Sequence, residues 1–178
     1  MKKLTAIFIL FLAAGAAKAE TRPYARAMFG AADAMQGAFT DRNGTHMTSS
    51  YSFSPTFSAA LGAKFESNIA VEAEFYTVAA IRQRGIQDQH TSLTAYTVNV
   101  AEFFPFHENG KINPFVGVGL GVVNSTFFLA KSNALAFNAF LGAVVNNLVV
   151  LRLKYLTGKT YGSPQNIFAL EGGYKFNL

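Results

Sequence analysis

The sequence predicts an all-β protein, an eight-stranded antiparallel transmembrane up-and-down β-barrel. Three observations indicate this fold. Apolar residues make up 51% of the chain and charged residues only 14%, against roughly 25% charged in an ordinary soluble domain. No segment after the first twenty residues is long and apolar enough for a spanning helix. Most of the chain instead alternates apolar and polar residues with the period of two that is typical of strands.

The first segment, residues 1–19, reads as a cleaved signal peptide. Lys2 and Lys3 give a positive start, an apolar run extends from 4 to 17, and Ala17-Lys18-Ala19 is a typical cleavage pattern. Its removal deletes three lysines, so Lys+Arg falls from 15 to 12 against 10 acidic residues and the net charge from +5 to +2. The remaining chain, 20–178, is then hardly basic, which argues against nucleic-acid binding.

An exported apolar chain without a spanning helix has few ways to cross a membrane, because only helices and closed barrels satisfy every backbone polar group in lipid. The chain has no Cys, which excludes disulfides and zinc–thiolate sites. Alternation over about 9–11 residues between turn signals predicts eight strands. These cover residues 23–31, 49–65, 69–80, 91–104, 112–123, 133–145, 148–157 and 165–178.

The connections between these strands predict which end faces outward. The first, third, fifth and seventh are long or polar, including 81–90, 124–132 and 158–164, whereas the second and sixth are tight turns at 66–68 and 146–147. The fourth, 105–110, is of medium length and contains Asn109-Gly110, a hairpin signal. Short periplasmic turns and longer external loops are typical of outer-membrane barrels.

Charged residues share one face of the predicted strands. Arg152 and Lys154, for example, alternate with Leu151, Leu153 and Tyr155. A basic side chain that faces lipid near the midplane costs about 2–4 kcal/mol, so the charged face is expected to point into the barrel. An eight-stranded barrel is narrow enough for side chains to fill it, and we expect a charge-paired lumen. Its predicted members are Arg26, Glu72, Glu74, Arg152, Lys154, Glu171 and Lys175.

A soluble, lipocalin-like ligand-binding barrel shows the same alternation with the two faces exchanged. The low charge fraction, the unequal connections and the small residues at alternate positions of 49–65 and 112–123 favour the membrane barrel. The glycines Gly117, Gly119 and Gly121 lack the following helix of a dinucleotide fingerprint. They are expected to relieve crowding inside a narrow barrel.

Two segments resemble the small outer membrane β-barrel domain family, the group similar to opacity proteins and the OmpA membrane domain. Residues 113–121, Asn-Pro-Phe-Val-Gly-Val-Gly-Leu-Gly, look like its P-[FY]-x-G-x-G-x-G strand, and 172–178, Gly-Gly-Tyr-Lys-Phe-Asn-Leu, resemble its terminal strand. The resemblance implies an outer-membrane location and recognition of Tyr174, Phe176 and Leu178 by the assembly machinery, although the chain ends in Leu and not in Phe. It is nearly silent on function.

No catalytic or metal-binding constellation is evident, and neither enzymatic activity nor a cofactor is expected. His46, His90 and His107 are not clustered. The segment His90-Thr91-Ser92 resembles the His and Ser of barrels that hydrolyse lipid A, but no acid is placed to orient His90, and Leu93 replaces that family's Asn.

The expected function is structural or surface-exposed: envelope integrity, or adhesion to a host or surface ligand through external loops, by a monomer in contact with outer-membrane lipid and lipopolysaccharide. A narrow porin-like channel and a lipid A-modifying enzyme are the alternatives. Aromatic residues in 124–132 are expected at the upper membrane interface. Basic side chains at the outer rim could form charge-assisted hydrogen bonds to lipopolysaccharide phosphates, or they could be hydrated loop charges without a partner. These residues are Arg42, Arg82, Arg84, Lys131 and Lys159.

Overall fold

A computed structural model of the protein describes residues 21–36, 39–40, 46–47, 53–83, 89–104, 111–127, 130–160 and 163–178. The predicted signal peptide, 1–19, lies outside these residues and remains a prediction. Among the residues that the structure describes, no helix is long and apolar enough to cross a membrane. Eight long strands form the fold: β1 (Arg22–Gln36), β4 (Phe53–Lys64), β5 (Ile69–Gln83), β6 (Gln89–Phe103), β7 (Ile112–Phe127), β8 (Ala130–Val145), β9 (Val149–Thr160) and β10 (Ser163–Asn177).

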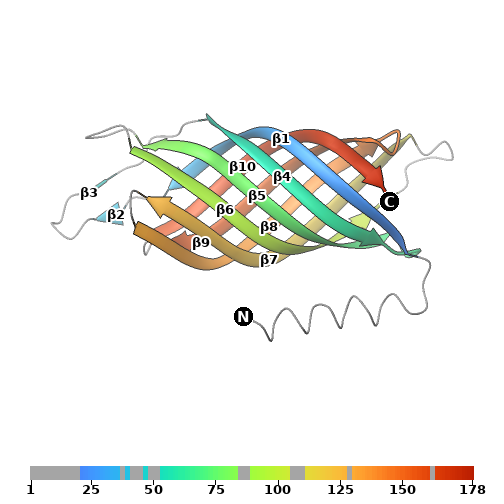
Figure 1. The fold of residues 1–178 in the computed structure, drawn as a ribbon, viewed down its shortest axis with the longest axis horizontal. Coiled ribbons are helices and arrows are strands. Elements are labelled where there is room, and N and C mark those ends of the chain that lie inside the picture. The colour runs from blue at the N-terminus through green and yellow to red at the C-terminus, as the bar shows by residue number, and fades with distance from the viewer. Residues whose placement is uncertain are drawn as a thin grey trace.

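The eight strands close into an antiparallel barrel in which each long strand pairs with the next (Figure 1). Closure comes from β1, which pairs with β4 on one side and with β10 on the other; the β1–β10 ladder runs from Tyr24↔Asn177 to Gln36↔Gln165. A closed ladder leaves no strand edge unpaired. The predicted fold class is therefore confirmed.

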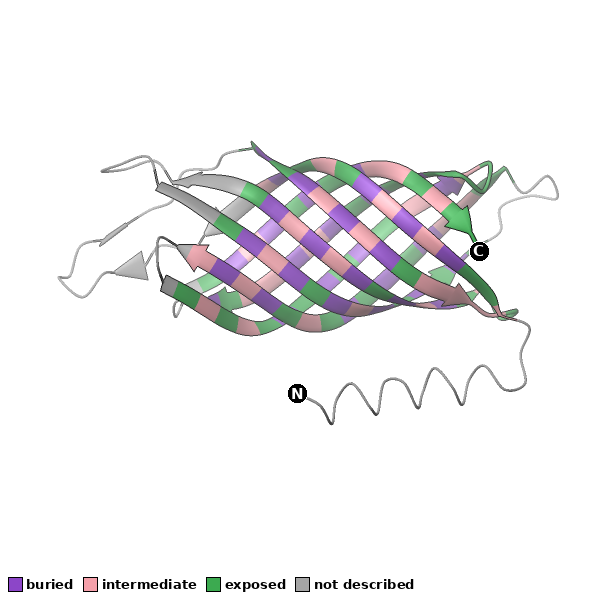
Figure 2. Cartoon of the chain, viewed as in Figure 1, coloured by how far each residue is buried: buried purple, intermediate pink, exposed green. Residues whose placement is uncertain are grey.

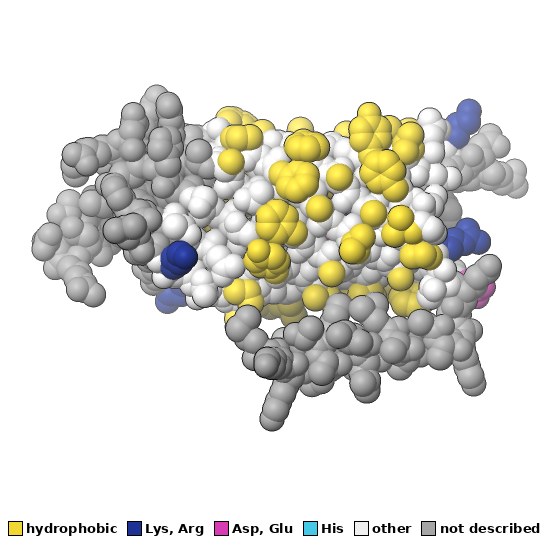
Figure 3. Space-filling view, viewed as in Figure 1, with side chains coloured by type: hydrophobic (Ala, Val, Ile, Leu, Met, Phe, Trp, Pro, Cys, Tyr) yellow, Lys and Arg dark blue, Asp and Glu magenta, His cyan; other side chains and the backbone are white. Residues whose placement is uncertain are grey.

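Buried and more exposed residues alternate along the strands of the barrel (Figure 2). In β9, Leu151 and Leu153 are 53% and 52% exposed, whereas Arg152 and Lys154 are 1% and 3% exposed. The same alternation holds in β4, where Phe53 is exposed and Ser54, Thr56 and Ser58 are buried. On the face seen in Figure 3, hydrophobic side chains cover the middle of the barrel, and Lys and Arg gather toward its ends.

The two ends of the barrel are named here by their connections. The turn end carries the β4–β5 and β8–β9 turns, and the loop end carries the connection 37–52. That connection contains a small ladder of its own, β2 (Phe39–Thr40) paired with β3 (His46–Met47). At the turn end Asn68, Asn146 and Asn147 have φ of 64°, 52° and 59°. Asn tolerates this left-handed conformation better than other residues with a side chain, and two consecutive left-handed residues are typical of a type I′ hairpin turn.

The predicted long connections 124–132 and 158–164 were wrong in length. In the structure β7 and β8 pair up to Phe127↔Ala130, and β9 and β10 pair up to Thr160↔Ser163. Only 128–129 and 161–162 separate the strands. Polar residues at a strand end still form ladder hydrogen bonds where both faces of the strand meet water, so polarity alone did not mark the end of the strand.

Strand β1 also runs further than expected, to Gln36, so Asp33 belongs to it and not to the following loop. In the two ladders Asp33 stands opposite Phe53 and Phe168, in the outward-facing phase of β1. Phe127, the first of the aromatic residues expected at the upper membrane interface, is the last residue of β7. The next two residues lie outside the described part of the chain, as does 105–110.

Candidate functional site: the charge layer of the lumen

A buried guanidinium bridges opposite walls of the barrel. Arg152 on β9 lies 2.5 Å from a carboxylate oxygen of Glu171 on the neighbouring strand β10. The same Nη2 lies 2.5 Å from Glu74 Oε1 on β5, four strands away around the barrel and hence across the lumen from β9. All three side chains are shielded from solvent. Arg152 therefore connects two walls that the backbone ladder does not join directly.

Neutral and cationic neighbours complete this cluster. Ser58 Oγ donates to Glu171 Oε1 over 2.9 Å, and Arg152 Nη2 donates to Ser58 Oγ over 3.1 Å. Lys154 Nζ lies 3.0 Å from Glu74 Oε2 and 4.2 Å from the centroid of the Tyr76 ring. Each carboxylate thus has a cation beside it, which a buried charge requires.

A second ion pair lies nearer the turn end. Arg26 Nη2 donates to Glu72 Oε2 over 2.7 Å, and Tyr24 Oη donates to Glu72 Oε1 over 2.5 Å. Both oxygens of Glu72 are therefore occupied. Tyr24 and Glu72 are almost completely buried, so the hydroxyl and the guanidinium replace the water that Glu72 would otherwise bind.

The side chains of Asn99 and Asn138 form an amide relay that extends the charge layer to β6 and β8. Asn138 Nδ2 on β8 donates to Asn99 Oδ1 on β6 over 2.9 Å, and Asn99 Nδ2 donates to Glu74 Oε2 over 2.8 Å. Gly119 on β7 lies between these two strands. A Cβ at Gly119 would come within 1.9 Å of Asn99 Oδ1, so only glycine leaves room for the relay.

The layer is electrically balanced and is enclosed by two apolar clusters. It holds three bases, Arg26, Arg152 and Lys154, and three acids, all almost fully buried. Toward the loop end lies a cluster that includes Tyr76, Leu93, Leu156 and Ile167. Toward the turn end lies a cluster that includes Tyr24, Met28, Phe115 and Phe140. Two aromatic rings of the turn-end cluster contact cations: Arg152 lies over Phe140 at 5.4 Å and Arg26 over Phe115 at 5.9 Å. Tyr76 of the loop-end cluster contacts Lys154.

Six of the seven residues predicted for the lumen network lie in this balanced layer. The seventh, Lys175, is only partly buried and lies over the rings of Tyr24 and Phe103, at 4.6 and 5.7 Å. Sequence reasoning did not single out Tyr24, Ser58, Asn99 and Asn138. The alternation in the sequence could have identified them, because each lies on the same face of its strand as other lumen-facing residues.

Of the five basic residues predicted at the outer rim, two are fully described by the structure. Arg42 and Arg84 lie outside the described residues; the backbone of Arg82 is placed in β5, but its side chain is not described. Lys131 and Lys159 are exposed near the loop end of β8 and β9. The residues of the predicted assembly signal, Tyr174, Phe176 and Leu178, are 54%, 51% and 73% exposed.

The described residues contain no group of three or more His, Cys, Asp or Glu side chains that could hold a metal ion. His46 is placed in β3 and His90 in β6, without a description of their side chains, and His107 lies outside the described residues. Ser92 is exposed. The backbone therefore positions His90 and Ser92 on the same strand, β6.

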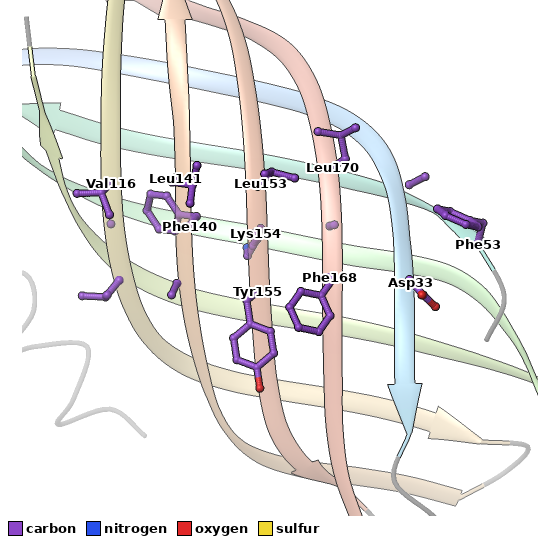
Figure 4. A pocket seen from close by; sticks show the side chains of 15 residues that line it. Asp33, Phe53, Val116, Phe140, Leu141, Leu153, Lys154, Tyr155, Phe168 and Leu170 are labelled. Atoms are coloured by element: carbon purple, nitrogen blue, oxygen red, sulfur yellow. The ribbon is translucent and has the colours of Figure 1, made fainter. Parts of the chain in front are cut away.

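A shallow groove follows the outer surface of β7–β10 and reaches β1 and β4 (Figure 4). Its lining is mainly aliphatic and aromatic and includes Leu141, Leu153, Phe168 and Leu170, with Asp33 at one side. Acyl chains would contact such a surface through dispersion and the hydrophobic effect.

No protein-family model and no curated protein sequence matches the chain. Solved structures do. Neisserial surface protein A is similar with a TM-score of 0.61 and 14% identity over 88% of this chain and 97% of that one. The outer membrane protein OprG from Pseudomonas aeruginosa has a TM-score of 0.56 and 11% identity over 90% and 98%.

The attachment invasion locus protein Ail of Yersinia pestis, solved with the heparin analogue sucrose octasulfate, has a TM-score of 0.50 and 16% identity over 86% of this chain and 99% of that one. At these identities the likeness shows the fold alone. The chain has the fold of these small outer-membrane β-barrels.

Proposed function

We propose that the protein is a monomeric, non-conducting barrel of the bacterial outer membrane with a structural or surface role. One observation carries this proposal: the lumen is crossed by a balanced charge layer with an apolar cluster on each side. A hydrated ion that entered would have to displace paired charges and then cross an apolar layer. Both steps are unfavourable in a low-dielectric interior.

The location in a membrane is supported by the outer surface. Among the outward-facing side chains that the structure describes, the charged ones are Asp33, Glu102, Lys131 and Lys159, all toward the ends of their strands. The surface between them carries exposed Leu, Val and Phe side chains, which water would solvate poorly and acyl chains would cover. The fold shared with outer-membrane proteins points to the same location.

Conductance measurements distinguish this proposal from the narrow-channel alternative. Purified protein inserted into planar bilayers is expected to give no steady ion conductance, with a known porin in the same bilayer showing that the assay detects channels. A steady conductance altered by Arg152→Ala in the lumen, but not by Leu153→Ala on the outer face, would overturn the proposal. Migration of unboiled protein as a compact species in gels verifies that each variant has folded.

We further propose that the loop end faces outward and that Lys131 and Lys159 contact lipopolysaccharide phosphates. Two exposed ammonium groups near the loop end of adjacent strands suit charge-assisted hydrogen bonds to phosphate. The sulfated ligand of Ail is an anion of related chemistry, so anionic host glycans are a second class of ligand for this rim.

Lipopolysaccharide is expected to raise the unfolding temperature of the wild-type barrel, and less so that of the Lys131→Gln/Lys159→Gln variant. Lys111→Gln is the matched control, because Lys111 is also exposed but precedes β7 at the turn end. Equal stabilisation of all three proteins would exclude the two rim lysines as the contact. The outward-facing Tyr174, Phe176 and Leu178 remain the proposed signal for the assembly machinery.

A further inference from the structure

Among the residues that the structure describes, the charges that face the lumen do not sum to zero. The central layer holds three acids and three bases. Two further bases, Lys64 and Lys175, occupy the lumen phase of β4 and β10 near the turn end, and both are partly buried. Among the described residues neither forms an ion pair. The surplus of positive charge therefore lies at one mouth of the barrel.

The two lysines converge on the same aromatic ring. Lys64 Nζ lies 5.0 Å and Lys175 Nζ 5.7 Å from the centroid of Phe103. Lys175 Nζ also lies 4.6 Å from the Tyr24 ring. A ring face attracts a cation only modestly at a partly exposed position. The rings thus position the ammonium groups without neutralising them.

None of the described acids forms an ion pair with either lysine. Glu72, the acid of the central layer that lies nearest the turn end, accepts from Tyr24 and Arg26 with both its oxygens. Glu66 is exposed in the β4–β5 turn and forms no ion pair among the described residues. Arg22 stands opposite Lys64 in the β1–β4 ladder and is exposed, which adds a third positive charge at the rim.

We propose that the turn-end mouth is an anion-binding site in which Lys64 and Lys175 together hold one phosphate-type group. Two like charges held near one ring repel each other, and a multivalent oxyanion between them removes that repulsion while it accepts charge-assisted hydrogen bonds from both. Low-dielectric walls on the inner side strengthen the attraction relative to that of an exposed lysine. This proposal does not depend on the rim lysines at the loop end. It also holds whether or not the barrel conducts ions.

NMR of lysines labelled by reductive ¹³C-methylation tests this site directly, because methylation keeps the charge. The purified protein is held in a maltoside micelle, which carries no phosphate, and chloride is exchanged for inorganic phosphate at constant ionic strength. The Lys64 and Lys175 signals are expected to move together and to saturate with one dissociation constant. The signal of Lys111, which is exposed at the same turn end, is expected to show no saturation.

Variants assign the signals and test the pairing. Lys175→Gln is expected to weaken the phosphate response of Lys64 by about tenfold, the loss of one hydrogen bond to a charged group, whereas Lys111→Gln leaves it unchanged. A linear drift of all lysines, or a Lys64 response that survives Lys175→Gln, would overturn the proposal. Nanodiscs of phosphatidylglycerol without free phosphate then identify the source: the same shifts there indicate a lipid headgroup, and their absence indicates a soluble phosphate.

Discussion

Arg152 and Glu171 stand opposite each other in the β9–β10 ladder, and the guanidinium that binds Glu171 also reaches Glu74 on the far wall. Backbone hydrogen bonds join only neighbouring strands. The Arg152 side chain is therefore a direct link between strands four positions apart in the barrel. It fixes the relative position of the two walls in a way that the ladder does not.

Replacement of Arg152 by Ala is expected to destabilise the barrel strongly. Glu171 then loses its cationic partner and keeps only the Ser58 hydroxyl, whereas Glu74 keeps Lys154. Removal of one member of a buried ion pair typically lowers the free energy of unfolding by about 3–5 kcal/mol. Urea titration of the protein in lipid vesicles, followed by the loss of the compact band in unboiled gels, measures the change.

Lys154→Ala is the matched comparison and is expected to cost less, because Glu74 retains Arg152. Leu153→Ala, between the two on the outer face, controls for changes in β9 itself. If Arg152→Ala and Lys154→Ala destabilise equally, the pairing of Glu171 does not govern the effect.

Gly119→Ala is expected to lower the stability by about 1–3 kcal/mol, the usual cost of overpacking. The new Cβ would overlap Asn99 Oδ1, which accepts the hydrogen bond from Asn138. The same urea titration applies, with Val118→Ala on the outer face as control. A Gly119→Ala protein as stable as wild type would show that the relay can shift without loss.

Asp33→Ala is expected to stabilise the protein by about 1 kcal/mol. The Oδ1 atom of Asp33 is buried and has no hydrogen-bond partner among the described residues. A buried polar atom without a partner costs free energy that alanine does not. Asp33→Asn keeps a polar atom at that position and is expected to gain less. A loss of stability in Asp33→Ala would instead reveal a favourable interaction of this carboxylate in the membrane.

Substitutions at Asn147, in the turn Asn146-Asn147, test the cost of its left-handed backbone conformation. Asn147 has φ of 59°, a conformation that costs alanine about 1–2 kcal/mol and glycine little. Asn147→Ala is therefore expected to destabilise the barrel, and Asn147→Gly to leave it near wild type. Equal effects would indicate that the Asn side chain matters more than its backbone conformation.

The alternation of apolar and polar residues shows which face of a strand each residue occupies, and nothing more. It placed Arg152 and Lys154 on the face opposite Leu151 and Leu153, and the structure has them buried and exposed accordingly. It carried no information on where strands end, so the strands that flank 128–129 were predicted too short. Beyond an apolar belt the ladder continues on polar residues, and the alternation that marks a strand disappears.

The sequence alone determined the number of strands, their antiparallel order and the side that each residue faces, because these depend on local alternation and turn residues. The tertiary structure decided which charges meet. Glu74 and Arg152 are 78 residues apart, and their contact depends on closure and on the stagger of the ladders around the barrel. The tertiary structure likewise separated Lys175 from the balanced layer and set it beside Lys64, since register, and not alternation, fixes how far along the lumen each side chain lies.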